Sequence, residues 1–214
     1  MEVFAAVLRN INEPLSIEKI DLQDAPGPGE VLVKISAVGA CRSDYSVMTG
    51  ASKHNLPVVV GHEGAGVIEK AGPGVKWSVG DQVVLNWAPN CGDRCDFCLD
   101  HRPNLCETYV DTMNEGTMMN GSTRLSKDGE TIYRYSSLGC MIEYLVVDQD
   151  CCIPVSKDVP PEVAALIGCA VTTGVGAALN AVKIRPGDTV AIFGMGGVGL
   201  STLLGAKLAG AGRV

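Results

Sequence analysis

The chain has 214 residues, and 17 Lys and Arg against 24 Asp and Glu give it a formal net charge of −7. This length can bury one large core, or one core and part of a second. There is no basic cluster to bind phosphate backbones or anionic lipid, which argues against a nucleic-acid partner. No apolar run approaches the ~18 residues that cross a bilayer, and the first residues lack a signal-peptide pattern. We therefore expect a cytoplasmic protein without a membrane partner.

The cysteine content directs attention to metal binding. There are nine cysteines, an odd number that a closed set of disulfides would not use up. In a reducing cytosol, clustered cysteines hold metal more often than they form disulfides. The spacing of the cysteines is therefore the main functional signal to follow.

Residues 1 to about 150 are predicted to form mainly strands. Short β-branched runs such as Val31–Ile35 and Gln82–Leu85 are bounded by Gly, Pro and Asp, which favour chain reversals. Many short strands with such turns indicate a small barrel or rolled sheet.

The pattern changes to helix from Pro160 onward. An alanine-rich stretch opens with a proline at a position suited to a first helical turn. Further on, the almost wholly apolar run 189–193 predicts a strand buried on both faces, as in parallel sheets. Glycines and an apolar helix from Val198 to Leu208 follow. We place a domain boundary near residue 172.

Three potential metal ligands stand far apart in the sequence. Cys41 lies in Cys41-Arg42-Ser43-Asp44, His62 lies in a glycine-rich turn, and Cys169 lies in the alanine-rich stretch. Two thiolates and one imidazole would make a three-ligand zinc site with its fourth position open, as catalytic zinc requires. Taken alone, Cys169 is better interpreted as a small apolar residue.

The two motifs together are more specific than any one ligand. The segment CRSD, followed about twenty residues later by GHEGAG, resembles the zinc-dependent medium-chain alcohol dehydrogenases, and the resemblance extends over the whole chain. It is greatest to the dimeric branch, with its liver-type enzymes and dehydrogenases of formaldehyde–thiol adducts. The resemblance implies a mostly β, GroES-like catalytic domain, a rolled barrel, over residues 1–172. An incomplete Rossmann domain, represented by its first β-α unit, would occupy residues 173–214.

The resemblance also implies roles for the residues around the first metal. Zinc is a Lewis acid that lowers the pKa of an alcohol, so that hydride can leave. In the family, a hydroxyl at Ser43 takes the alcohol proton, a carboxylate at Asp44 orients the ligand histidine, and Glu63 lies near the zinc. Many relatives pass the proton to a histidine shortly after the hydroxyl, but Tyr45-Ser46-Val47 contains none. Ser46, the cofactor ribose or water are the alternatives for this step.

A second set of ligands lies within one loop. It consists of four cysteines that suit a closed structural zinc site: Cys91, Cys95, Cys98 and Cys106. Relatives usually have two residues between the first pair, whereas three stand here, so either the first knuckle bulges or Cys91 approaches from another angle. A disulfide-bonded or degraded loop is the alternative. His101 in the same loop is interpreted as solvated, and three further cysteines as structural thiols: Cys140, Cys151 and Cys152.

The last part of the chain carries a G-x-G-x-x-G motif between the predicted strand and helix. Such glycines allow a tight turn, close approach of backbone to a pyrophosphate, and packing of helix on strand. By resemblance, the residues that contact the cofactor are Arg42, Thr173, Gly194, Gly196, Gly197, Val198 and Gly199. The acid expected ~20 residues beyond the glycines would favour NAD over NADP. The chain does not reach it, so we expect NAD, with NADP as the alternative, and little binding by these residues alone.

The sequence thus predicts an oxidoreductase that binds two zinc ions per chain and transfers hydride from an alcohol to NAD(P), giving an aldehyde or ketone. A homodimeric, full-length parent would carry the activity, and the 214-residue chain alone is expected to be inactive. One alternative is a truncated zinc-binding module without activity. Another is an S-(hydroxymethyl)thiol dehydrogenase. Cys41, His62 and the four-cysteine loop argue against a zinc-free quinone reductase of the same fold.

Overall fold

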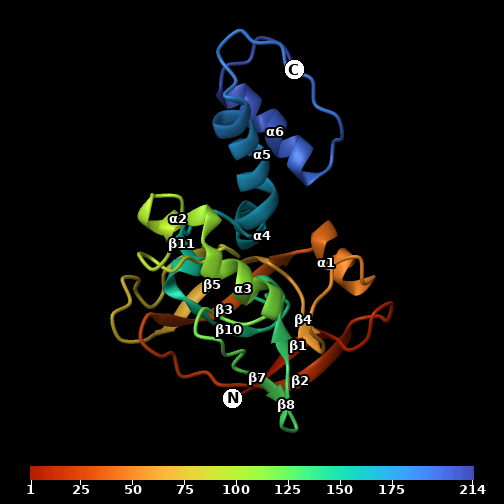
Figure 1. Cartoon of the computed structure of the whole chain (residues 1–214), viewed down its shortest axis with the longest axis vertical. Coiled ribbons are helices and arrows are strands. Elements are labelled where there is room, and N and C mark those ends of the chain that lie inside the picture. Colours follow the sequence, from red (N-terminus) through yellow and green to blue (C-terminus); the bar gives the residue numbers. More distant parts are fainter. The chain divides into compact units, whose positions relative to one another are not determined.

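The computed structural model describes all 214 residues, which divide into two compact units, Met1–Ala165 and Leu166–Val214. The first unit is mostly β (Figure 1). Its strands are β1 (Glu2–Leu8), β2 (Ser16–Leu22), β3 (Glu30–Gly39), β4 (Val58–Val59), β5 (Glu63–Ala71), β6 (Gln82–Leu85), β7 (Leu125–Lys127), β8 (Glu130–Thr131), β9 (Tyr133–Arg134), β10 (Tyr144–Asp148) and β11 (Cys152–Pro154).

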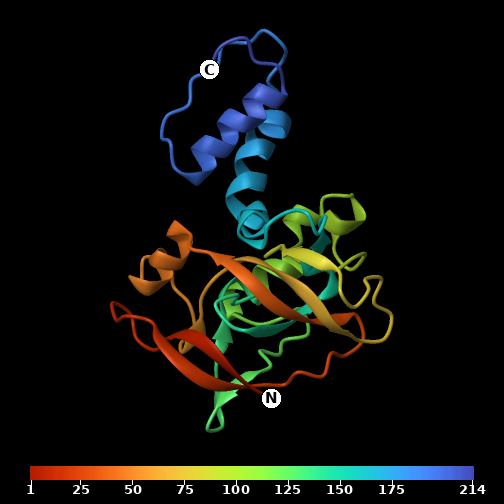
Figure 2. The ribbon, with the colours of Figure 1, turned by 180° about the vertical axis from the view of Figure 1, so that it is seen from behind.

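These strands form two sheets that roll around one core. The first has the order β8-β7-β2-β1-β4-β9 and the second the order β10-β3-β5-β6-β11. Neighbours are antiparallel except for the short parallel pair β4–β9. The long curved strands are seen from behind in Figure 2. This nearly closed, barrel-like arrangement confirms the prediction of a rolled β domain.

The core explains why the predicted strands form. Val31, Leu32 and Val33 of β3 are buried, and so is every residue of β6. Each runs against β5, where Gly66 allows close approach: a Cβ there would lie 2.2 Å from the carbonyl oxygen of Lys34. The expected strands at 31–35 and 82–85 are thus confirmed as parts of β3 and β6.

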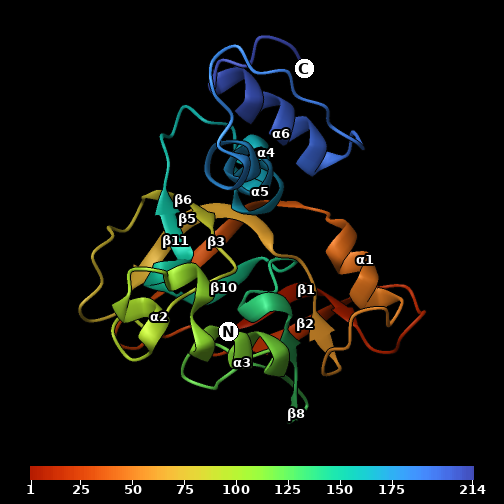
Figure 3. The ribbon, with the colours of Figure 1, turned by 45° about the horizontal axis from the view of Figure 1, so that its top comes forward.

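Short helices occupy the connections of the first unit. They are α1 (Arg42–Met48), α2 (Asp96–Leu99), α3 (Glu107–Glu115), and the 3-10 helices η1 (Pro103–Leu105), η2 (Tyr135–Ser137) and η3 (Gln149–Cys151). α1 and α2 lie at opposite ends of the β unit (Figure 3). The two predicted groups of metal ligands, around Cys41 and in the four-cysteine loop, therefore belong to different regions of the fold.

One continuous helix runs over Pro161–Val182, as the predicted change to helix requires. It consists of α4 (Pro161–Leu166), π-helical turns at Ile167–Val171 and Ala177–Val182, and α5 (Thr172–Gly176) between them. With 22 residues and a mean hydropathy of 1.7, it is long and apolar enough to cross a membrane. The expectation that no run approaches this length was wrong, because Gly and Thr interrupt the apolar residues without lowering the mean enough. A core helix of a soluble protein passes the same test.

The second unit pairs this helix with α6 (Gly197–Leu208), and Figure 1 shows α5 and α6 side by side. α6 confirms the predicted helix. The predicted strand at 189–193 was wrong, since only a single bridge forms, between Thr189 and Arg213. Phe193 is 97% exposed. A β-strand needs ladder partners, and one bridged residue does not supply them. The assignment of residues 173–214 to a cofactor domain stays a prediction.

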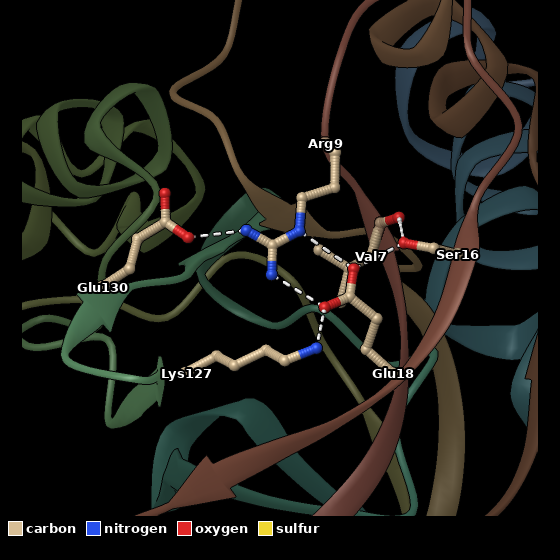
Figure 4. A network of polar contacts seen from close by, with 6 residues as sticks. All are labelled: Val7, Arg9, Ser16, Glu18, Lys127 and Glu130. Atoms are coloured by element: carbon tan, nitrogen blue, oxygen red, sulfur yellow. Dashed lines mark hydrogen bonds and ion pairs between the residues drawn. The ribbon is translucent and has the colours of Figure 1, made fainter.

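An ion-pair network links Arg9, which directly follows β1, to side chains of the neighbouring strands β2, β7 and β8 of the first sheet (Figure 4). Arg9 donates two hydrogen bonds to the carboxylate of Glu18, of 2.9 and 2.7 Å, and a third of 2.6 Å to Glu130. Lys127 donates to Glu18 at 2.7 Å. The Glu18 side chain is 11% exposed, and the hydrogen bonds from Arg9 hold the pKa of Glu18 well below its usual range.

We expect Glu18→Gln to lower the free energy of unfolding by about 1.5–3 kcal/mol at neutral pH, as for other hydrogen bonds to charged groups. Because the folded pKa of Glu18 is depressed, this stabilisation is present above the unfolded pKa and is lost as pH falls through the folded one. Urea unfolding at several pH values measures the difference. The matched control is Glu2→Gln, whose partner Lys19 is 54% exposed, and there we expect no more than about 1 kcal/mol. Equal effects of the two substitutions would contradict the prediction.

Candidate functional site

The first predicted site begins where α1 starts. Cys41 precedes the helix with an extended backbone, and Asp44 in the first turn accepts a 2.9 Å hydrogen bond from the backbone N–H of Cys41. The Sγ atom of Cys41 lies 3.7 Å from the hydroxyl oxygen of Ser43. The reciprocal capping of this helix therefore fixes the direction of the Cys41 side chain.

The imidazole arrives from the turn before β5. Gly61 has φ of +96°, and a Cβ there would lie 2.8 Å from the Met141 side chain, so only glycine suits this turn. His62 follows, and Glu63 opens β5 opposite Gly39. Both side chains are buried, at 3% exposure each. The pairing of β3 with β5 thus fixes the positions of His62 and Glu63 next to the end of β3.

Asp44 connects the two segments. Its Oδ1 accepts a hydrogen bond from the N–H of Gly61 at 2.9 Å and lies 3.2 Å from Nδ1 of His62. A carboxylate only accepts, so the proton of the imidazole is on Nδ1 and the lone pair of Nε2 is available to a metal. The ligand atoms of Cys41, His62 and Glu63 lie within 4.8 Å of one another. The structure therefore brings these three predicted residues together with Asp44 and Ser43.

Aromatic rings surround the imidazole. The ring of His62 meets Tyr135 edge-on with centroids 5.2 Å apart, and Trp87 edge-on at 6.4 Å. Tyr135 in turn meets His54 edge-on, with ring centroids 5.5 Å apart. Burial raises the pKa of Tyr135. Sequence reasoning missed these residues because no motif contains them.

The four-cysteine loop forms a compact cluster. Its sulfurs lie within 4.8 Å of one another, and those of Cys91 and Cys98 are 3.6 Å apart. A tetrahedral zinc with Zn–S of about 2.3 Å places its sulfurs just under 4 Å apart, so the cluster fits a zinc site. At 3.6 Å the pair is also not a disulfide, for which S–S is about 2.05 Å. Burial, and then the neighbouring sulfurs, raise the pKa of the metal-free Cys98 thiol to about 12.

The first knuckle, with its extra residue, turns at Gly92. Gly92 has φ of +74°, a left-handed conformation, and its N–H bonds the side chain of Asn90 at 3.0 Å. Arg94 donates to the carbonyl of Cys91 at 3.2 Å and closes the loop. His101 is exposed, in agreement with its interpretation as solvated. The remaining thiols of the first unit are buried: Cys140, Cys151 and Cys152.

The other predicted residues have these positions. Arg42 is exposed and its guanidinium lies 5.0 Å from the ring centroid of Tyr45. In the second unit, Cys169 lies in the π-helical turn Ile167–Val171 and Thr173 in α5. The glycine motif forms the turn into α6, which begins at Gly197. It includes Gly194, with φ of +97°, and Gly199, where a Cβ would lie 1.9 Å from the carbonyl oxygen of Gly194.

The fold and the clusters define a GroES-like β domain with two groups of cysteine, histidine and acidic side chains that could hold a metal ion. Residues 27–157 match the family model described as the alcohol dehydrogenase GroES-like domain. The chain therefore belongs to the zinc-dependent alcohol dehydrogenase family, and the predicted resemblance is confirmed.

Two curated relatives are similar over almost the whole chain. An alcohol dehydrogenase class-3 from Myxine glutinosa is 40% identical over 98% of this chain and 56% of its own length. An S-(hydroxymethyl)glutathione dehydrogenase from Synechocystis sp. is 40% identical over 100% of this chain and 58% of its own length. The chain thus spans under three fifths of the length of these relatives.

Solved structures of alcohol dehydrogenases are similar to this chain over almost its whole length. An alcohol dehydrogenase zinc-binding domain protein from Burkholderia ambifaria has a TM-score of 0.92 and 35% identity, covering 99% of this chain and 57% of its own. Benzyl alcohol dehydrogenase from Acinetobacter calcoaceticus has a TM-score of 0.91 and 33% identity, with the same two coverages.

We expect Asp44→Asn to destabilise the metal-free protein by about 1–3 kcal/mol. The Asn side chain has one acceptor oxygen and one NH2 donor, so at least one of the three N–H groups around residue 44 would lose its acceptor. The affinity for zinc at the first site should fall about 10–100-fold, since His62 loses the partner that fixes its tautomer. Thermal unfolding and competition with a chromogenic chelator measure the two effects. Asp81→Asn is the control, because Asp81 accepts one exposed hydrogen bond from Ser78. Unchanged zinc affinity in Asp44→Asn would refute the role of Asp44.

Proposed function

We propose that these residues form the zinc-binding part of an oxidoreductase that transfers hydride from an alcohol to NAD(P) and releases an aldehyde or ketone. The observation that supports this most is the buried hydrogen bond of Asp44 to Nδ1 of His62. It leaves Nε2 as the ring nitrogen with a free lone pair, in a group where the ligand atoms of Cys41, His62 and Glu63 lie within 4.8 Å of one another. This donor set suits zinc, which binds thiolate sulfur, imidazole nitrogen and carboxylate oxygen.

Two zinc ions per chain would be held by the two sets of residues. Cys41, His62 and Cys169 are proposed for the catalytic ion, and Cys91, Cys95, Cys98 and Cys106 for the structural ion. When bound, the catalytic zinc supplies Lewis-acid chemistry that makes the hydroxyl of an alcohol more acidic, and NAD(P) supplies the hydride acceptor.

The side chains around the first site would handle the proton and the orientation of the ligands. The hydroxyl oxygen of Ser43 lies 3.7 Å from the Cys41 sulfur. We propose that it accepts the proton from the hydroxyl of the alcohol while Ser43 gives up its own hydroxyl proton. Asp44 keeps His62 in one tautomer. Glu63 places a negative charge near the metal, and the rings of Trp87 and Tyr135 restrict access of water to the imidazole.

The proposed contacts with the cofactor come from the glycine motif of the second unit and two further residues. The N-terminus of α6 is suited to a pyrophosphate, because its N–H groups lack partners within the helix and glycines line the turn. The residues proposed for the cofactor are Arg42, Thr173, Gly194, Gly196, Gly197, Val198 and Gly199. NAD is proposed as the cofactor, with NADP as the alternative.

The substrate is proposed to be a small-molecule alcohol. A hydroxymethyl thiol is the second candidate, since two 40%-identical relatives are a class-3 alcohol dehydrogenase and an S-(hydroxymethyl)glutathione dehydrogenase. We propose a cytoplasmic protein without nucleic-acid or membrane partners, whose full-length parent is a homodimer. A zinc-binding module without activity of its own is the remaining alternative.

We expect the reduced protein to contain two zinc ions per chain, and Cys98→Ser to retain one, because a closed four-sulfur site tolerates the loss of a thiolate poorly. Elemental analysis after gel filtration counts the metal. Cys152→Ser, which alters a buried thiol outside both clusters, should keep two zinc ions. Wild-type protein without zinc would refute both sites, and two zinc ions in Cys98→Ser would refute the structural one.

The proposed oxidation is tested in the longest natural polypeptide that contains these residues. We expect NADH or NADPH to form with benzyl alcohol, ethanol or S-(hydroxymethyl)glutathione, and the rate to vanish after zinc is removed. Ser43→Ala should lower kcat by about 100-fold or more, the usual contribution of proton transfer. Ser52→Ala, at an exposed position, is the control. Zinc-loaded protein that oxidises none of these substrates would leave the zinc-binding module as the function.

A further inference from the structure

Two aromatic rings connect the four-cysteine loop to the imidazole of the first site. The ring of Trp87 meets that of His62 edge-on, with centroids 6.4 Å apart. The same ring meets Tyr109 at a tilt, with centroids 5.9 Å apart. Both distances lie within the range of about 4.5–7 Å over which aromatic side chains attract each other. A continuous row of ring contacts therefore runs from Tyr109 through Trp87 to His62.

The indole of Trp87 also packs against the core of the four-cysteine loop. That core is a small cluster of buried side chains: Cys91, Cys98, Cys106 and Tyr109. Trp87 is half-buried, and it packs both on this cluster and on the main core of the β domain. One side chain is thus shared by the loop and by the β core.

Short stretches of chain tie the two rings to cysteines of the loop. Trp87 stands four residues before Cys91, and Tyr109 stands three residues after Cys106. Cys106 directly precedes α3, so a metal bound to its sulfur would hold the start of the helix that carries Tyr109. The side chain of Asn86 makes two hydrogen bonds to the backbone two residues later, which restrict the segment that carries Trp87. A metal that gathers the sulfurs would therefore also hold the two rings against each other.

The contact with Trp87 matters to the first site because the imidazole of His62 is buried, at 3% exposure. The apolar side chains around a metal site control the access of water and the local dielectric. Partners that orient a ligand from outside the metal are worth about 10–100-fold in metal affinity. Without metal in the loop, the constraint on Tyr109 and Trp87 is released, and His62 loses a fixed neighbour.

We propose that Trp87 is a positioning residue that couples the two metal sites. Metal in the four-cysteine loop holds Trp87 against His62, and this raises the affinity of the first site for zinc. The inference rests on the proposed function. Coupling between two binding sites is reciprocal, so zinc at the first site strengthens zinc binding in the loop by the same factor.

The test measures the metal affinity of the first site with and without metal in the loop. Cobalt(II) is the probe, because cobalt held by four sulfurs and cobalt held by sulfur and imidazole absorb differently in the visible. The longest natural polypeptide that contains these residues is titrated against a competing chelator. We expect Cys98→Ser, which removes the loop metal, to lower the cobalt affinity of the first site by about 5-fold or more. Cys152→Ser, which alters a buried thiol outside both groups, should leave this affinity unchanged.

A double-substitution cycle separates the coupling from a general loss of stability. In the Trp87→Ala background, Cys98→Ser should change the first-site affinity by less than about 2-fold, because the connection is already broken. Trp87→Phe keeps an aromatic ring and should retain most of the coupling. The control is Trp77→Phe, since Trp77 packs on the main core but not on the four-cysteine loop. This variant should show the coupling of the wild type.

Tyr109→Leu breaks the row of rings while every cysteine stays in place, so it decides the question even where Cys98→Ser does not fold. The loop should still bind cobalt, yet the first-site affinity should fall about as far as in Cys98→Ser. Tyr109→Phe, which keeps the ring, should behave as the wild type does. An unchanged first-site affinity in Tyr109→Leu, or an effect of Cys98→Ser that is equal with and without Trp87, overturns the coupling alone. Wild-type protein that binds no cobalt through sulfur and imidazole overturns the proposed function and the coupling together.

Discussion

The carboxylate of Asp44 is the group on which the rest of the first site depends. It is 3% exposed, and it receives the N–H groups of Cys41 and Gly61 and the imidazole of His62. A buried donor left without an acceptor costs about 1–3 kcal/mol, so three donors around one carboxylate strongly restrict the positions of both segments. The helix start and the turn before β5 are therefore held together before any metal binds.

The two clusters reach the same chemistry by different routes. The four cysteines of the four-cysteine loop lie within sixteen residues, so a short segment with its own turns and small helices can bring them together. At the first site, the thiol and the imidazole approach because β3 and β5 are paired over most of their length. The position of this site is thus a property of the sheet, and it depends on the close strand contact that Gly66 permits.

This difference decides what the sequence could predict. Local spacing identified the four-cysteine loop, the strands within β3 and β6, and helix α6, since each of these depends on residues that are neighbours in the sequence. The first site was found by resemblance, because two motifs marked its residues. The network around Glu18 and the edge-on contact of Tyr135 with His62 depend on long-range packing that no local pattern records. Residues 189–193 failed for the same reason, since an apolar run becomes a strand only beside other strands.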